Sequence, residues 1–346
     1  MNRQGESETP HMIPHQPDVT FRRLRGAIDY PLLLAIMNQS LEADRITHRG
    51  SLAEVTRHFA PSDRFDPSQD VLIAAVDQGN GQEKAAVGFS RMHWYTGQED
   101  TRLYCQSSYL LPEWRHGNLW RIMVERNERR LNEIAASHVT TTARFLQAWA
   151  TNGQQEWMSI LKGAGYKAVR RYHNMIHQLD RIPERSLPQG IEIRPVSPAH
   201  FRKIWEVQRE INQELFEYVA EDWTEESYAI WREKSTNSCQ LWQVAWDGDS
   251  VVGMVLNRMD DTPPRDGAKQ RGYTEQILIR RQWRKRGIAS ALIAESLRIL
   301  REQGVKEVEL GVDSENASNA LELYRSLGYS MSSVDTWFRK PMLNEG

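Results

Sequence analysis

At 346 residues the chain is long for one ordinary domain, which favours two. Apolar residues make up 40% of the sequence and charged residues 26%, a balance that excludes the disordered and membrane-spanning classes of protein. The formal net charge of −2 removes the electrostatic basis for a nucleic-acid-binding surface.

The N-terminal segment, residues 1–17, is polar and rich in Pro and His, so we expect a disordered tail and not a signal peptide. No segment has the length and apolarity of a membrane span, and we expect a cytoplasmic protein without a membrane partner. Cys105 and Cys239 cannot form a disulfide framework. His173 and His177 lie four residues apart but fall in a segment with strand character, so no metal is expected.

The remaining sequence contains two copies of one plan. In the first copy, the apolar run 71–77, a Gly-rich loop and the run 85–92 predict a β-hairpin. Residues 241–259 repeat this pattern, with the hairpin signal Asp247-Gly248-Asp249 at their centre. A polar, Pro-bearing stretch at 181–190 separates the copies and predicts a linker. The domains are therefore expected at 18–180 and 191–346.

Two further correspondences fix the alignment of the copies. Arg115 matches Arg284 (284 − 115 = 169), and Gly165 matches Gly328 (328 − 165 = 163). In each copy we predict a strand, two helices, three antiparallel strands, a helix, a strand, a helix and two closing strands. That order gives a mixed α/β sheet with helices on both faces.

The most specific motif lies in the second copy, between the strand-like run 273–279 and the helical run 289–297. The turn there reads Arg284-Lys285-Arg286-Gly287-Ile288-Ala289. Unpaired amides at a helix N-terminus and the helix dipole both favour phosphate oxygens, and a glycine lets the backbone approach an anion. A solvated basic turn is the alternative. The R-x-x-G-x-A pattern between a strand and a helix favours a pyrophosphate cradle.

This turn and the later segment Leu323-Tyr324-Arg325-Ser326-Leu327-Gly328-Tyr329 resemble motifs of the GCN5-related N-acetyltransferase (GNAT) family. The resemblance covers residues 240–340 strongly and both halves weakly. It implies two tandem acyl-CoA N-acyltransferase (GNAT) domains, each a mixed, largely antiparallel sheet flanked by helices. The tandem arrangement with an active second half also resembles that of mycothiol synthase, whose substrate we do not carry over.

The resemblance further implies acetyl-CoA as co-substrate and direct transfer of its acetyl group to a primary amine in a ternary complex. Backbone N–H groups of Ile277, Leu278 and Ile279 would face the thioester, and Asn316 would contact CoA as a helix cap. The residues implied at the pyrophosphate are Arg284, Lys285, Arg286, Gly287, Ile288, Ala289 and Ser290.

Two candidates for proton transfer follow from the family pattern. Tyr324 would protonate the departing thiolate, a mildly uphill step because a thiol has a pKa of ~8.5 and a phenol ~10. The alternative is a packing tyrosine on an amphipathic helix. Glu275, nine residues before Arg284, stands where relatives often carry a base. Its alternative is a side chain that strand alternation turns to solvent.

The first copy lacks the candidates of the second. Asn118 and Trp120 stand where Gly287 and Ala289 are expected, Gln106 matches Glu275, and Leu161 matches Tyr324. These replacements predict a degenerate domain that supports packing or shapes the acceptor cleft. A second register places Gly117 opposite Gly287 but loses the arginine.

The acceptor is chosen in this fold largely by the first two helices, here about residues 201–234, which are rich in acids and aromatics. Such groups suit a small cationic amine, although solvated helix faces would have the same composition.

The rival hypotheses are a non-catalytic acyl-CoA-binding or interaction module, and transfer of a different acyl group. We expect a monomer or a homodimer.

Overall fold

The computed structural model describes residues 19–46, 49–77, 84–97, 100–138, 142–214, 223–259, 270–315 and 320–342. The expected tail, residues 1–17, and Asn316 lie outside this part of the chain. Within it, no helix is both long enough and apolar enough to cross a lipid bilayer.

Helices and strands follow the predicted order in both halves as far as the closing strands, except that the first half has a third, short helix before its three strands. The first half contains β1 (Val19–Arg23), α1 (Tyr30–Ala43), α2 (Leu52–His58), α3 (Pro67–Asp70), β2 (Val71–Val76), β3 (Ala85–Thr96), β4 (Arg102–Leu110), α4 (Leu119–Ala136), β5 (Arg144–Thr151), α5 (Gln155–Gly163) and β6 (Lys167–His177). The second half contains β7 (Ile191–Ile193), α6 (Phe201–Asn212), α7 (Glu225–Ser235), β8 (Gln243–Asp247), β9 (Ser250–Met259), β10 (Arg271–Ile279), α8 (Ile288–Glu302), β11 (Glu307–Asp313), α9 (Ala320–Ser326) and β12 (Ser330–Pro341).

The strands join into one mixed sheet in the order β1-β2-β3-β4-β5-β12-β6-β11-β10-β9-β8-β7. Both predicted hairpins are confirmed, and the turn between β8 and β9 pairs Asp247 with Ser250. Gly248 has a φ of 52°, as that tight turn requires. In each half one neighbouring pair, β4 with β5 and β10 with β11, runs parallel.

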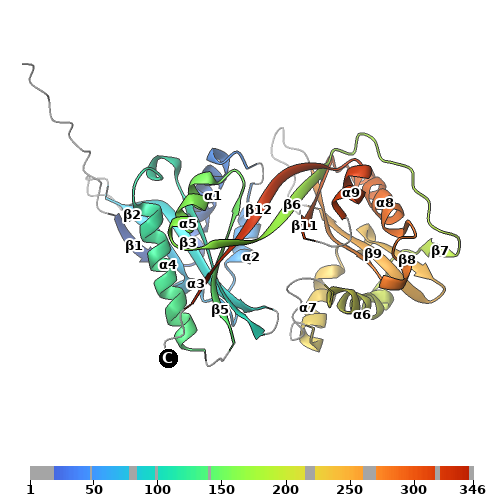
Figure 1. Ribbon diagram of the computed structural model, residues 1–346, viewed down its shortest axis with the longest axis horizontal. Helices are drawn as coiled ribbons and strands as arrows, with labels where there is room; N and C mark the ends of the chain where they lie inside the picture. The colour runs from blue at the N-terminus through green and yellow to red at the C-terminus, as the bar shows by residue number, and fades with distance from the viewer. Residues whose placement is uncertain are drawn as a thin grey trace, which may run out of the picture.

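The closing strands differ from the prediction of two in each copy. Each half supplies one long strand, β6 or β12, and these two strands pair with each other. β12 also pairs with β5 of the first half, while β6 pairs with β11 of the second. Figure 1 shows both strands running between the two lobes. The halves therefore exchange their last strands, because a strand pattern alone does not specify its partner.

Apolar residues on the exchanged strands complete the core of the opposite half. Phe338 of β12 is 1% exposed and packs in the first-half core with residues of α4 and α5. Met175 of β6 is fully buried in the second-half core with residues of α8 and α9. On the opposite faces of the sheet, α1 and α2 cover the first half and α6 covers the second. Helices thus lie on both faces, as predicted.

Candidate active site

The turn before α8 has the geometry of an anion site. Gly287 is the N-cap of α8 and has a φ of 83°, which favours glycine. A Cβ built there meets nothing within 4 Å. The first helical hydrogen bond runs from Ala291 N to Gly287 O at 3.1 Å, and no side chain caps the helix. Within the described residues, the amides of 288–290 therefore have no acceptor. We call Gly287 and these amides the α8 cradle.

Some side chains around the α8 cradle are exposed to solvent, and others are buried in the core. Lys285 and Arg286 are exposed, and Lys285 has a φ of 61°, an uncommon conformation for a residue with a side chain. Ile288 is 1% exposed and anchors the start of the helix in the second-half core. Ala289 and Ser290 are half-buried. The structure thus brings the predicted cradle residues together, with their backbone outward.

Arg284 is held by protein groups. Its Nε donates to Ile279 O at 2.9 Å, and its guanidinium also pairs with Glu214 at 2.7 Å. Arg115 of the first half repeats this arrangement by donating to Leu110 O at 3.3 Å and pairing with Asp44. Both arginines fasten the end of a strand to the segment after the first helix. Because the two arginines have this common role, the two halves align with Arg115 opposite Arg284, and not with Gly117 opposite Gly287.

The strand before the cradle opens away from its parallel neighbour. Parallel pairing between β10 and β11 covers Arg271–Thr274 and Glu307–Leu310, and ends there. The register of β10 on β9 shifts between Thr274 and Gln276, which makes Glu275 the extra residue of a β-bulge. Beyond the bulge, residues 277–279 pair with β9 on one side only. Their other edge faces the gap where β10 and β11 have separated.

Glu275 lies on the side of the sheet that carries α6. Its carboxylate accepts a hydrogen bond from Arg258 Nε at 2.8 Å, and the side chain is 52% exposed. The neighbouring Gln276 accepts from Gln208 of α6 at 2.9 Å. Glu275 therefore faces the helices expected to choose the acceptor, and remains accessible to solvent.

The bulge changes the comparison of Glu275 with the first half. Thr274 donates to Asn257, which donates to Ser296 on α8. Gln106 is likewise directed toward the corresponding helix, accepting from Asn127 of α4 at 2.9 Å. Because β3 and β4 pair without a bulge, Gln106 corresponds in direction to Thr274, and the first half has no counterpart of Glu275.

Tyr324 lies on α9 and is 7% exposed, within the second-half core. Its ring lies 6.0 Å from that of Tyr329, and its hydroxyl forms no hydrogen bond with the described residues. Burial raises the pKa of Tyr324 to about 12. This shift moves the pKa of the phenol further from that of a thiol, whereas matching the two pKa values would require a lower phenol pKa. The phenol stays protonated, but its proton is harder to release.

In the first half, two tryptophans occupy the two positions at which the second half has alanines. Trp120 matches Ala289 (289 − 120 = 169), and Trp157 matches Ala320 (320 − 157 = 163). Both tryptophans are at most 3% exposed, and their ring centroids lie 4.8 Å apart between α4 and α5. The motif of the second half indicates Trp120 by its alignment, whereas Trp157 is indicated only by the 163-residue offset.

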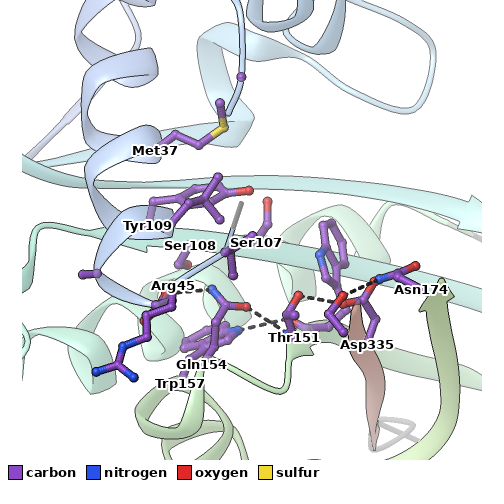
Figure 2. A pocket seen from close by; sticks show the side chains of 18 of the residues that line it. Met37, Arg45, Ser107, Ser108, Tyr109, Thr151, Gln154, Trp157, Asn174 and Asp335 are labelled. Carbon is purple, nitrogen blue, oxygen red and sulfur yellow. Dashed lines mark hydrogen bonds between the residues drawn. The ribbon is translucent and has the colours of Figure 1, made fainter. Parts of the chain in front are cut away.

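A large cavity of about 1130 Å³ lies in the first half and not at the α8 cradle. Its lining residues come from α1, α2, β3 and β4, from the corner between β5 and α5, and from β6 and β12. Arg271 and Glu309 of the second half also reach it. Figure 2 shows Met37, Tyr109, Thr151 and Asp335 around it. We call this space the first-half cavity.

The expected acceptor helices use many of their acids and aromatics for internal contacts. Trp205 packs against Trp223, Tyr228 and Trp231, with centroid distances of 4.4, 5.8 and 5.2 Å. Glu210 pairs with Arg280, Glu214 with Arg284 and Glu225 with Arg202. The composition of this segment therefore reflects packing and ion pairs as well. Its acids at 217, 221 and 222 lie outside the described residues.

The sequence predicts that the protein binds no metal, and only the described residues can be searched for possible ligands. No group of three or more potential ligands gathers among the described residues. His173 and His177 lie on β6, as the strand character of that segment predicts. His177 Nδ1 accepts a hydrogen bond from Leu179 N at 2.9 Å.

Residues 204–329 match the family described as Acetyltransferase (GNAT) family. That segment contains the opened strand, the α8 cradle and Tyr324. The second half of this chain is therefore similar to the GNAT family of acetyltransferases. The fold of this chain agrees with that of a GCN5-related N-acetyltransferase from Sphaerobacter thermophilus, with a TM-score of 0.72 at 22% identity over 93% of this chain and 95% of that one.

Two relatives are similar in sequence and differ in name. A mycothiol acetyltransferase of Renibacterium salmoninarum is 24% identical over 203 residues, which is 57% of this chain and 58% of the relative. The N-alpha-acetyltransferase 30 of Schizosaccharomyces pombe is 25% identical over 144 residues, 40% of this chain and 83% of the relative. The match thus spans little more than half of the first of these relatives.

Proposed function

We propose that the protein is an N-acetyltransferase that moves the acetyl group of acetyl-CoA to a primary amine of a small molecule. The observation that carries this proposal is the α8 cradle, where Gly287 is open and three successive amides have no acceptor in the part of the chain that the structure describes. These donors fit the pyrophosphate of CoA, because a helix N-terminus favours phosphate oxygens. The family match over residues 204–329 supports the same reading.

We also propose that the chain consists of two tandem GNAT domains, with the active one at 191–346. The halves share their order of elements, the parallel pair at the opening and the arginine that fastens the strand end. Trp120 and Trp157 close the corresponding space in the first half. One acetyl-CoA is therefore expected per chain.

In this proposal each residue of the second half has a separate task. Amides of the opened β10 edge, residues 277–279, polarise the thioester carbonyl. Glu275, on the α6 side, accepts the proton of the ammonium directly or through water. The amine then attacks the carbonyl, the carbon–sulfur bond breaks, and Tyr324 delivers a proton to the thiolate. With a pKa of about 12, donation to a thiol of ~8.5 costs about 5 kcal/mol unless substrate binding lowers it.

Direct transfer is favoured because Cys239 cannot serve as an acyl carrier where it lies. It is 8% exposed at the start of the β8 region and packs in the apolar cluster under α6. We predict that Cys239→Ala keeps at least about half of the activity, measured as thiol release from acetyl-CoA. A folded but inactive variant would replace direct attack with a covalent acyl-enzyme.

The acceptor class is tested with one panel of amines. Thiol release from acetyl-CoA is followed with polyamines, amino sugars, aminoglycosides and peptide N-termini, while calorimetry measures acetyl-CoA binding. We expect turnover with a small amine and a stoichiometry near one. Tight binding without turnover for any amine would favour a binding module or another acyl group. Preference for a peptide would exclude the small-molecule acceptor, and a stoichiometry near two would contradict a closed first half.

A further inference from the structure

The first-half cavity is lined by a half-buried positive charge that no carboxylate among the described residues neutralises. Arg91 of β3 lines it, with its guanidinium 4.1 Å from the centre of the Phe65 ring. One nitrogen bonds His93 Nδ1 at 2.8 Å, and Nε is buried without a partner. Among the described residues it forms no ion pair. Since buried charges in proteins are normally paired, this arginine lacks an anion.

Nearby groups do not remove this charge. Burial lowers the pKa of Arg91 to about 10, which leaves it protonated at neutral pH. Burial and the charge of Arg91 lower the pKa of His58 to about 4 and of His93 to about 3, so both are neutral. Asp70, the carboxylate that acts on Arg91 from a distance, is already paired with Arg130 at 2.8 Å.

The carboxylates that line the cavity have protein partners of their own. Asp44 pairs with Arg115, and Glu309 pairs with Arg271 at 3.3 Å. Glu54 belongs to the capping box of α2 with Ser51. Asp335 accepts from Thr151 at 2.6 Å and from Asn174 at 2.8 Å, as Figure 2 shows. Arg91 is thus the cation of this wall for which a ligand must supply the negative charge.

Two hydroxyl groups lie on the same face of the sheet as Arg91. Ser107 is its register partner on β4, and Tyr109 follows two residues later, so alternation directs all three side chains to one side. Figure 2 shows Ser107 and Tyr109 at the cavity. The Tyr109 ring stacks on Phe89 at 5.1 Å. A guanidinium and two hydroxyls therefore meet an apolar wall, which continues in Phe59, Met37 and Leu41.

We propose that the first-half cavity is a second binding site, which takes a small amphipathic carboxylate. The carboxylate lies against Arg91, Ser107 and Tyr109, and the apolar body fills the space under α1 and α2. The volume suits one ligand of drug-like size. This site is independent of the α8 cradle, because it lies on the α1 and α2 side of the other half of the sheet.

The test compares carboxylates with their neutral amides. Calorimetry on the full chain measures binding of benzoate, 2-naphthoate and indole-3-acetate, and of benzamide, 2-naphthamide and indole-3-acetamide. We expect at least one acid to bind one per chain and at least about tenfold more tightly than its amide, the effect of one charged contact. Equal affinity within every pair, or no binding by any acid, would overturn the proposal.

Variants then assign the preference to Arg91. Arg91→Met should abolish the difference between acid and amide, whereas Arg45→Met, at an exposed arginine of the cavity rim, should keep it. Circular dichroism and the melting temperature report whether the variants fold, and Arg91→Gln serves as a second, polar replacement. A preference that survives both Arg91 variants would contradict the site. Saturating acetyl-CoA should leave carboxylate binding unchanged, and displacement would show that the two share one site.

Discussion

At the scale of single residues, matched positions in the two halves differ in backbone conformation and in side-chain chemistry. Gly287 is open and left-handed, whereas Asn118 at the matching position has a φ of −96°. Tyr324 is a buried phenol, and the matching Leu161 is fully buried in apolar surroundings. Glu275 has no counterpart because it is the extra residue of a bulge. Catalytic potential thus depends on a few local changes on a shared framework.

The α8 cradle predicts a strong effect of one side chain. Gly287→Val should weaken acetyl-CoA binding ~100-fold, because a branched side chain at positive φ distorts the amides that would hold phosphate. Gly304→Val is the matched control, since Gly304 has a φ of 84° and also meets nothing within 4 Å, at the opposite end of α8. Calorimetry should show near-normal affinity for the control. Equal losses in both variants would indicate general backbone strain.

Tyr324→Phe should lower kcat by ~10²-fold or more and change acetyl-CoA affinity little, since the phenol acts as the thiolate leaves. It should also change alkaline stability. The folded-state pKa of about 12 exceeds the unfolded ~10, so the contribution of Tyr324 is complete below pH ~10 and is lost as pH rises through about 12. Urea unfolding at pH 9 and pH 11 should therefore show a smaller alkaline loss for the variant. An identical loss in both proteins would contradict the shift.

At the scale of secondary structure elements, α4 and α5 pack differently from α8 and α9. The Trp120 and Trp157 rings contact each other in a tilted arrangement between the first pair of helices, whereas Ala289 and Ala320 stand at the matching positions of the second. Large side chains there stabilise a core. In the proposed function, the small ones leave space for a ligand at the expense of packing.

The contact between the two indoles predicts that removing one of them lowers stability without creating a second binding site. Trp120→Ala should lower the free energy of unfolding by ~3–5 kcal/mol, because it removes a buried indole and leaves a cavity. Acetyl-CoA should still bind with a stoichiometry near one, since Asn118 does not reproduce the open, left-handed Gly287. Denaturant titration and calorimetry check the two parts. A second binding event in the variant would show that Trp120 alone closes the first half.

At the scale of the whole molecule, the exchange of β6 and β12 joins the halves into one sheet. Each half lacks the strand between its own last two strands, β5 and β6 or β11 and β12, unless the other half supplies it. Phe338 of β12 and Met175 of β6 are part of the core of the opposite half, so each core also depends on the other half. A cut in the linker therefore leaves each fragment with exposed strand edges and an incomplete core.

Separate fragments ending at Asp180 and beginning at Ile191 are predicted to be unfolded or insoluble when produced alone. Produced together, they should associate and restore acetyl-CoA binding, because β6 and β12 can pair across the cut. Purification through a tag on one fragment, followed by circular dichroism, measures this. A cooperative unfolding transition in an isolated fragment would show that exchange is not required for its stability.

The sequence by itself predicted most of the order of elements, the hairpins and the turn before α8. These features depend on nearby residues, such as the periodicity of α8 and the Asp247-Gly248-Asp249 turn. The 169-residue correspondence similarly exposed the altered first-half turn. Local patterns suffice where the physical cause lies within a few residues.

Only the tertiary structure decided which strands pair, where Glu275 points and how charges are neutralised. The strand patterns of β6 and β12 fit either half, and the bulge that turns Glu275 depends on the register with β9. Arg284 resembles a phosphate ligand until Glu214, 70 residues away, is seen to hold it. Arg91 became significant only when folding placed it beside a cavity without an anion. Pairing between distant residues is set by the whole sheet, because many local sequences satisfy the same pattern.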